Sequence, residues 1–131
     1  MTPTVVDANV VMYLIAAPDG FDVVTREDLI APPLLWPEVR SVLHVARGRG
    51  LISGAEAREA LEVFDDSPIR ERKHPRLGAE VWRIADELGW MKTYDAEYLA
   101  LASLVGAPLA TLDRRMGRAA ERLGIAPYDL A

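Results

Sequence analysis

Hydrophobic residues recur along this chain in two patterns, short continuous runs and helical stripes. Runs rich in β-branched or aliphatic residues lie within residues 2–9, 28–32 and 107–113 and predict short buried strands. Between them, apolar residues repeat at the spacing of one helical face. The predicted helices are residues 10–17, 34–50, 53–68, 76–90, 96–105 and 114–124. Strands alternating with helices, without hairpin turns, indicate an α/β fold whose parallel sheet is covered on both faces.

Local signals mark several of these boundaries. Ser53 and Glu56 have the spacing of a capping box, Pro37 is tolerated in a first helical turn, and Gly124 ends the last helix. Residues 68–75 are bracketed by prolines and fit either a short strand or an exposed loop. Residues 125–131 fit an edge strand.

Length and composition narrow the class of protein. The chain has 131 residues, half of them hydrophobic, and no cysteine. This profile predicts one globular domain over residues 1–131, and it excludes disulfides, thiolate zinc sites and cysteine nucleophiles. The absence of cysteine fits a reducing cytosol, so we expect a cytoplasmic protein. No apolar run approaches the roughly 20 residues that span a bilayer, so no membrane partner is expected.

The formal net charge of −5 argues at first against nucleic acid, because phosphate binding depends on Lys and Arg. The basic residues are nevertheless clustered, and each cluster fits either a solvated face or a binding site. The clusters are Arg40, Arg47 and Arg49; residues 69–74 with Arg76; and Arg114, Arg115 and Arg118.

Four acidic residues occupy comparable positions. Asp7 and Asp113 end strands, whereas Glu38 and Asp95 lie in the first turns of helices. In an open α/β sheet these positions face the carboxyl ends of the strands, where ligand sites form. Each acid also has an ordinary structural interpretation, as a turn residue, a helix cap or a complement to a helix dipole. Four acids at one edge favour a shared site.

Clustered carboxylates repel one another, so such a site normally holds a cation. All-oxygen ligands suit Mg²⁺ or Mn²⁺. His44 and His74 have no second histidine at ligand spacing, which makes a zinc site the weaker interpretation.

The motifs VVDANV, LLWPEV, TYDAEYLALA and ATLDRRM resemble, in this order, the four acidic motifs of PIN-domain ribonucleases. The chain is most similar to the VapC toxins of toxin–antitoxin pairs. The resemblance implies that Asp7, Glu38, Asp95 and Asp113 are the catalytic, metal-binding acids. Thr111 matches a supporting hydroxyl, and Asn9 stands where the family commonly has Ser or Thr.

The resemblance further implies a three-layer α/β/α PIN-like fold with a central parallel sheet of four or five strands. It implies an endoribonuclease that uses Mg²⁺ or Mn²⁺ to activate water, and a homodimer. Arg40, Arg114 and Arg115 would then contact the RNA. It also implies a small antitoxin partner, whose helix would lie beside Leu34, Leu35 and Trp36, although these residues also fit core packing.

Two other classes stay open. A haloacid-dehalogenase-type phosphatase also begins with a strand ending in Asp, but that family has a second Asp where Asn9 stands here. A non-catalytic PIN fold could serve as a binding module for protein or RNA. The presence of all four acids disfavours that alternative, and a nuclease assay with and without Mn²⁺ separates the two.

Overall fold

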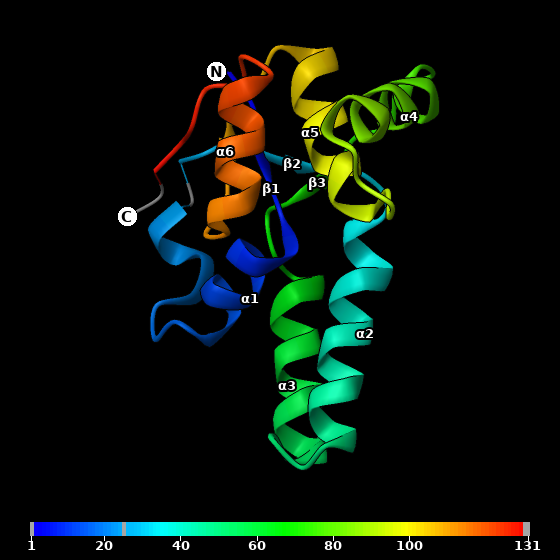
Figure 1. The fold of residues 1–131 in the computed structure, drawn as a ribbon. Coiled ribbons are helices and arrows are strands. Elements are labelled where there is room, and N and C mark those ends of the chain that lie inside the picture. The colour runs from blue at the N-terminus through cyan, green and yellow to red at the C-terminus, as the bar shows by residue number, and fades with distance from the viewer. Residues whose placement is uncertain (1, 25, 130–131) are drawn as a thin grey trace.

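A four-stranded parallel sheet lies at the centre of the molecule. The computed structural model describes residues 2–24 and 26–129 (Figure 1). The strands are β1 (Thr4–Val6), β2 (Leu29–Ala31), β3 (Arg70–Glu71) and β4 (Leu109–Ala110). Their order is β3-β2-β1-β4, and every neighbouring pair is parallel. The predicted α/β class with a parallel sheet is confirmed.

Helices flank this sheet and supply the rest of the core. They are α1 (Ala8–Ala16), α2 (Leu35–Gly48), α3 (Gly54–Asp65), α4 (Leu77–Leu88), α5 (Tyr94–Val105) and α6 (Arg114–Arg122). A short 3-10 helix, η1 (Gly20–Val24), was not predicted. Five consecutive residues of α5, from Tyr98 to Ala102, are buried, which explains why its sequence is apolar on nearly every side.

The predicted capping box and the two segments left open by the sequence can be compared with the structure. Ser53 and Glu56 form both hydrogen bonds of the capping box that opens α3. Residues 68–75 contain the edge strand β3, which resolves the open choice in favour of a strand. Residues 125–131 contribute one parallel bridge, between Pro127 and Leu109, rather than a strand; residues 130 and 131 lie outside the described part.

The hairpin of α2 and α3 projects from the body of the molecule (Figure 1). At its base the rings of Trp36 and Phe64 pack with centroids 6.0 Å apart, and Phe64 is buried. Leu35 is completely buried and Leu34 packs against the core. Core packing therefore explains Leu34, Leu35 and Trp36. No helix among the described residues is long and apolar enough to cross a membrane.

Candidate active site

The four predicted acids meet around one cavity at the carboxyl ends of β1 and β4. The cavity has a volume of about 200 Å³. It is lined by Asp7, Ala8, Asn9, Glu38, Val42, Asp95, Tyr98, Asp113 and Met116. Because β1 and β4 are adjacent and parallel, the residues that follow them emerge side by side. The arrangement is the one expected for a ligand site in an open α/β sheet.

Asp7 is the most enclosed of these acids, with 4% of its surface exposed. It follows β1 and caps α1, since the Val10 N–H donates to its Oδ1 over 3.0 Å. The Thr111 hydroxyl donates to the other oxygen, Oδ2. Burial raises the pKa of Asp7, and the charges of Asp113 and Asp95 add to that rise, while the two hydrogen bonds oppose it. Asp7 is thus a helix cap and a cavity-lining carboxylate together.

Asp113 repeats this combination after β4. Its Oδ1 accepts from the backbone N–H groups of Arg115 (2.8 Å) and Met116 (3.3 Å), which caps α6. Its own N–H donates to the Thr111 Oγ1 over 3.1 Å. Thr111 therefore ties the loop carrying Asp113 to the carboxylate of Asp7.

Glu38, in the first turn of α2, accepts a hydrogen bond of 2.6 Å from the Tyr98 hydroxyl. Burial raises the pKa of Glu38, and the bond from Tyr98 opposes this. Tyr98 also fits the apolar stripe of the helix predicted over residues 96–105, so the sequence did not predict this contact. The signal was its place three residues after Asp95, since residues at that spacing lie on one side of a helix.

Asp95 is not a helix cap. The cap of α5 is Thr93, which makes no side-chain capping bond. The Asp95 Oδ2 instead accepts from the Arg115 Nη1 over 3.2 Å. The Arg115 guanidinium also stacks on Trp90, with Cζ 4.1 Å from the ring centroid. Arg115 therefore forms an ion pair with one of the four acids.

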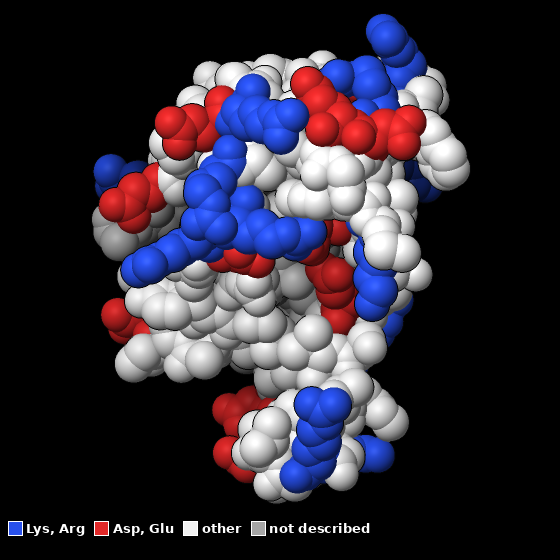
Figure 2. Space-filling view, in the orientation of Figure 1, with Lys and Arg blue, Asp and Glu red and all other residues white. Residues whose placement is uncertain are grey.

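The other two candidate arginines line different cavities. Arg40 lies with His44 and Arg47 in a groove between α2 and α3, and Arg114 lines a cavity beside the segment after α6. Figure 2 shows basic side chains crossing the face over α6, with acidic side chains visible in the hollow beside them. Arg115, which contacts Asp95, is a basic residue at the margin of the acidic cavity.

The donor chemistry fits a hard divalent cation, because every candidate ligand is a carboxylate or another oxygen group. Within the described residues, however, no three Asp, Glu, His or Cys side chains are close enough to form a ready-made cage. Mg²⁺ commonly binds through one or two carboxylates, several waters and substrate phosphate. The cavity fits that mode of binding, with a coordination shell completed by water and substrate.

The comparisons with known proteins agree with this geometry. The PIN domain family matches residues 4–122, so the chain belongs to the PIN-domain family. The chain is 34% identical over 125 residues to ribonuclease VapC1 of Mycobacterium tuberculosis, which covers 91% of this chain and 92% of that protein. The match to PIN domains removes the phosphatase alternative.

Two solved structures have similar folds. PAE2754 from Pyrobaculum aerophilum matches with a TM-score of 0.72 and 28% identity, over 90% of this chain and 79% of that chain. VapBC-1 from nontypeable Haemophilus influenzae matches with a TM-score of 0.66 and 13% identity, over 98% of both chains. At 13% identity the second likeness shows the fold alone.

Proposed function

We propose that this protein is a metal-dependent endoribonuclease and the toxin of a toxin–antitoxin pair. The observation that carries the proposal is the convergence of Asp7, Glu38, Asp95 and Asp113 on one cavity in a PIN domain. The relationship to ribonuclease VapC1 supports RNA as the substrate. A carboxylate cluster facing a phosphodiester would otherwise repel it, so the site needs a cation.

Asp7, Glu38, Asp95 and Asp113 would hold Mg²⁺ or Mn²⁺, with Asn9 at the exposed margin. A bound ion of this kind supplies Lewis acidity, which lowers the pKa of water and offsets charge on phosphate oxygens. Thr111 and Tyr98 fix the orientation of Asp7 and Glu38 by hydrogen bonds. Because water would attack, the products should carry 5′-phosphate and 3′-hydroxyl ends.

The direct test is cleavage of cellular RNA by the purified protein with Mn²⁺, with Mg²⁺ and with EDTA, followed by sequencing of the new 5′ ends. Asp95→Asn should fold, lose cleavage and lose most of the thermal shift that Mn²⁺ gives the wild type. Asp86→Asn, on the exposed face of α4, is the matched control. Retained cleavage by Asp95→Asn would remove Asp95 from the catalytic set, whereas a wild type that is inactive with both metals would favour a non-catalytic binding module.

The proposed antitoxin partner would bind to exposed apolar residues of α2. Val42 and Val45 are each more than two-fifths exposed, and Val42 also lines the acidic cavity. A partner helix lying there could extend a basic side chain toward the four acids. Val45→Asp should disrupt co-purification with a protein expressed from the neighbouring reading frame, and should leave RNA cleavage unchanged.

A homodimer is also part of the proposal, because pairing would bury apolar helix surface and double the basic area around the sites. Light scattering at tens of micromolar protein should report twice the chain mass of 14.4 kDa. A monomer at that concentration would contradict it.

A further inference from the structure

A second cavity opens directly beside the acidic one. It has a volume of about 400 Å³ and shares Glu38 and Asp95 with its neighbour. Its remaining lining comes from Met91 and Lys92 in the α4–α5 loop, Tyr94 in the first turn of α5, and Arg115 of α6. A ligand that reached from one cavity into the other would therefore pass the acids.

The outer wall of this second cavity exposes large apolar groups to solvent. Tyr94 is 59% exposed and Met91 is fully exposed. The Tyr94 side chain makes no hydrogen bond or ring contact in the described part of the chain, so no polar or aromatic partner within it explains the exposed ring. An exposed aromatic ring beside a polar cavity is suited to stacking on a nucleobase.

Two cations line the same cavity as this ring. Lys92 is exposed and forms no ion pair within residues 2–24 and 26–129. Arg115 is held in place by Trp90 on one side and Asp95 on the other. A flat hydrophobic group next to two positive charges matches one nucleotide, with a base for Tyr94 and a phosphate for Lys92 and Arg115. The positive charges favour RNA over an apolar protein helix.

We propose that this cavity is a subsite for one unpaired nucleotide adjacent to the cleaved bond, with its base on Tyr94 and its phosphate at Lys92 and Arg115. The assignment rests on the proposed ribonuclease function and makes it more specific, because the substrate must present a flipped or single-stranded base. A base inside a duplex has no free face for the Tyr94 ring.

The experiment measures binding by fluorescence anisotropy at low salt with Ca²⁺ in place of Mg²⁺ or Mn²⁺, so that a hard cation offsets the charge of the acids, and a gel verifies that the probe stays intact. The probe is a labelled, mixed-sequence single-stranded RNA of about twelve nucleotides, compared with its duplex. Tyr94→Ala should weaken binding of the single strand by about fivefold or more and leave duplex binding unchanged. Tyr94→Phe should bind like the wild type, since stacking does not need the hydroxyl. Tyr13→Ala removes an equally exposed tyrosine from α1 and should have no effect.

Salt dependence separates the two kinds of contact. Lys92→Ala should make the negative slope of log K against log salt less steep by about 0.7, the value for one phosphate of a single strand. Tyr94→Ala should not change the slope.

Two results would overturn the subsite even if Mg²⁺-dependent cleavage is found: single-strand binding that Tyr94→Ala leaves intact, and a wild type that does not bind the single strand. Loss of antitoxin co-purification in Tyr94→Ala with intact RNA binding would assign the surface to the protein partner. Tyr94-dependent binding without cleavage would keep the subsite and reject the nuclease.

Discussion

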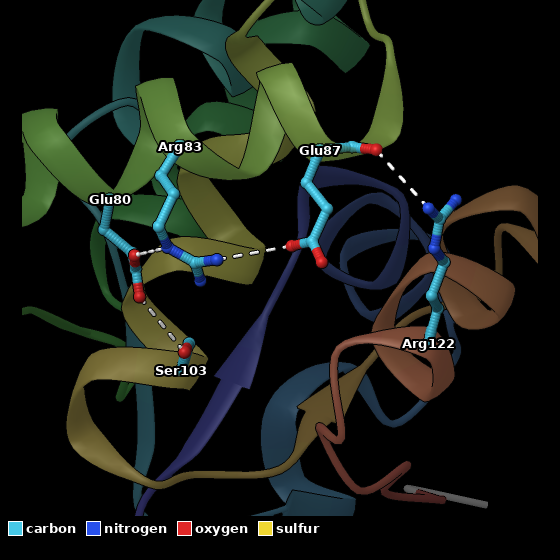
Figure 3. A network of polar contacts seen from close by, with 5 residues as sticks. All are labelled: Glu80, Arg83, Glu87, Ser103 and Arg122. Atoms are coloured by element: carbon cyan, nitrogen blue, oxygen red, sulfur yellow. Dashed lines mark hydrogen bonds and ion pairs between the residues drawn. The ribbon is translucent and has the colours of Figure 1, made fainter.

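Two clusters of carboxylates in this molecule have opposite environments. On α4, Arg83 lies between Glu80 and Glu87, with Nε 2.5 Å from the Glu80 Oε1 and Nη1 3.3 Å from the Glu87 Oε2 (Figure 3). The Ser103 hydroxyl and the Arg122 guanidinium add bonds to this network. The hydrogen bond from Arg83 lowers the pKa of Glu80. In the cavity at the sheet edge, burial instead raises the pKa of Asp7 and Glu38.

The difference is the one expected between carboxylates that stabilise a fold and carboxylates that belong to a functional site. The α4 cluster has its own cation, Arg83, and both Arg83 and Glu87 are exposed to water. Asp7 and Glu38 receive only neutral donors, and the charges near them repel. Groups with perturbed pKa values in a cavity are candidates for function, since selection for stability alone would remove them.

The largest effect is expected for Asp7→Asn. Cleavage should fall more than about a hundredfold, because residues that only support a metal ligand already cost 10- to 100-fold. The pKa of Asp7 is higher in the folded state than its ordinary value of 3.8. Stability should therefore fall as the pH rises from 3.8 through the pKa of the folded state, because Asp7 ionises less readily in the fold. At neutral pH the variant should therefore be at least as stable as the wild type, and urea titrations at several pH values would measure this. A large loss of stability at neutral pH would show that Asp7 is a structural carboxylate.

Thr111→Val should have the next largest effect. It removes the donor to Asp7 and the acceptor for the Asp113 N–H while it keeps the shape of the side chain. We expect a 10- to 100-fold loss of cleavage and a loss of about 1–3 kcal/mol in the free energy of unfolding. Thr111→Ser keeps both bonds and should restore most of the activity. A Val variant as active and as stable as the wild type would show that the hydroxyl and its two hydrogen bonds are not needed.

Tyr98→Phe should change the pH dependence of RNA cleavage. Loss of the hydroxyl removes the bond that opposes the raised pKa of Glu38, so the pKa of Glu38 should rise further. The acidic limb of the cleavage rate profile should move to higher pH, with a smaller change at the alkaline end of the profile. An unchanged profile would indicate that ionisation of Glu38 does not limit the reaction.

Glu80→Gln should have the smallest effect and is the matched substitution in the other cluster. Cleavage should be unchanged, and the melting temperature should fall by no more than about 3 °C, because exposed ion pairs contribute little. The pKa of Glu80 is lower in the folded state than its ordinary value of 4.5. Its contribution to the free energy of unfolding is therefore present above pH 4.5 and disappears as the pH falls through the pKa of the folded state. Added salt should reduce the difference from wild type. A loss of cleavage as large as that of Asp7→Asn would end the distinction between the two clusters.

The sequence by itself determined the elements and the candidate acids. Helical stripes, the capping box at Ser53 and the apolar run of α5 depend on residues a few positions apart, so their signals are complete within the local chain. Asp7 and Asp113 could be placed at strand ends for the same reason. The single domain over residues 1–131 stays a prediction.

Only the tertiary structure decided which of these residues meet. Thr111 donates to Asp7 across 104 positions of sequence and Tyr98 donates to Glu38 across 60, and both contacts require the packing of separate elements. Residues 68–75 became a strand because the edge of β2 was available, which no local pattern encodes. Likewise, Arg40, Arg114 and Arg115 are alike in sequence, but only Arg115 lies against Trp90 and Asp95. The physical reason is that periodicity and capping act over one or two helical turns, whereas a site at a sheet edge exists only after the strands have paired.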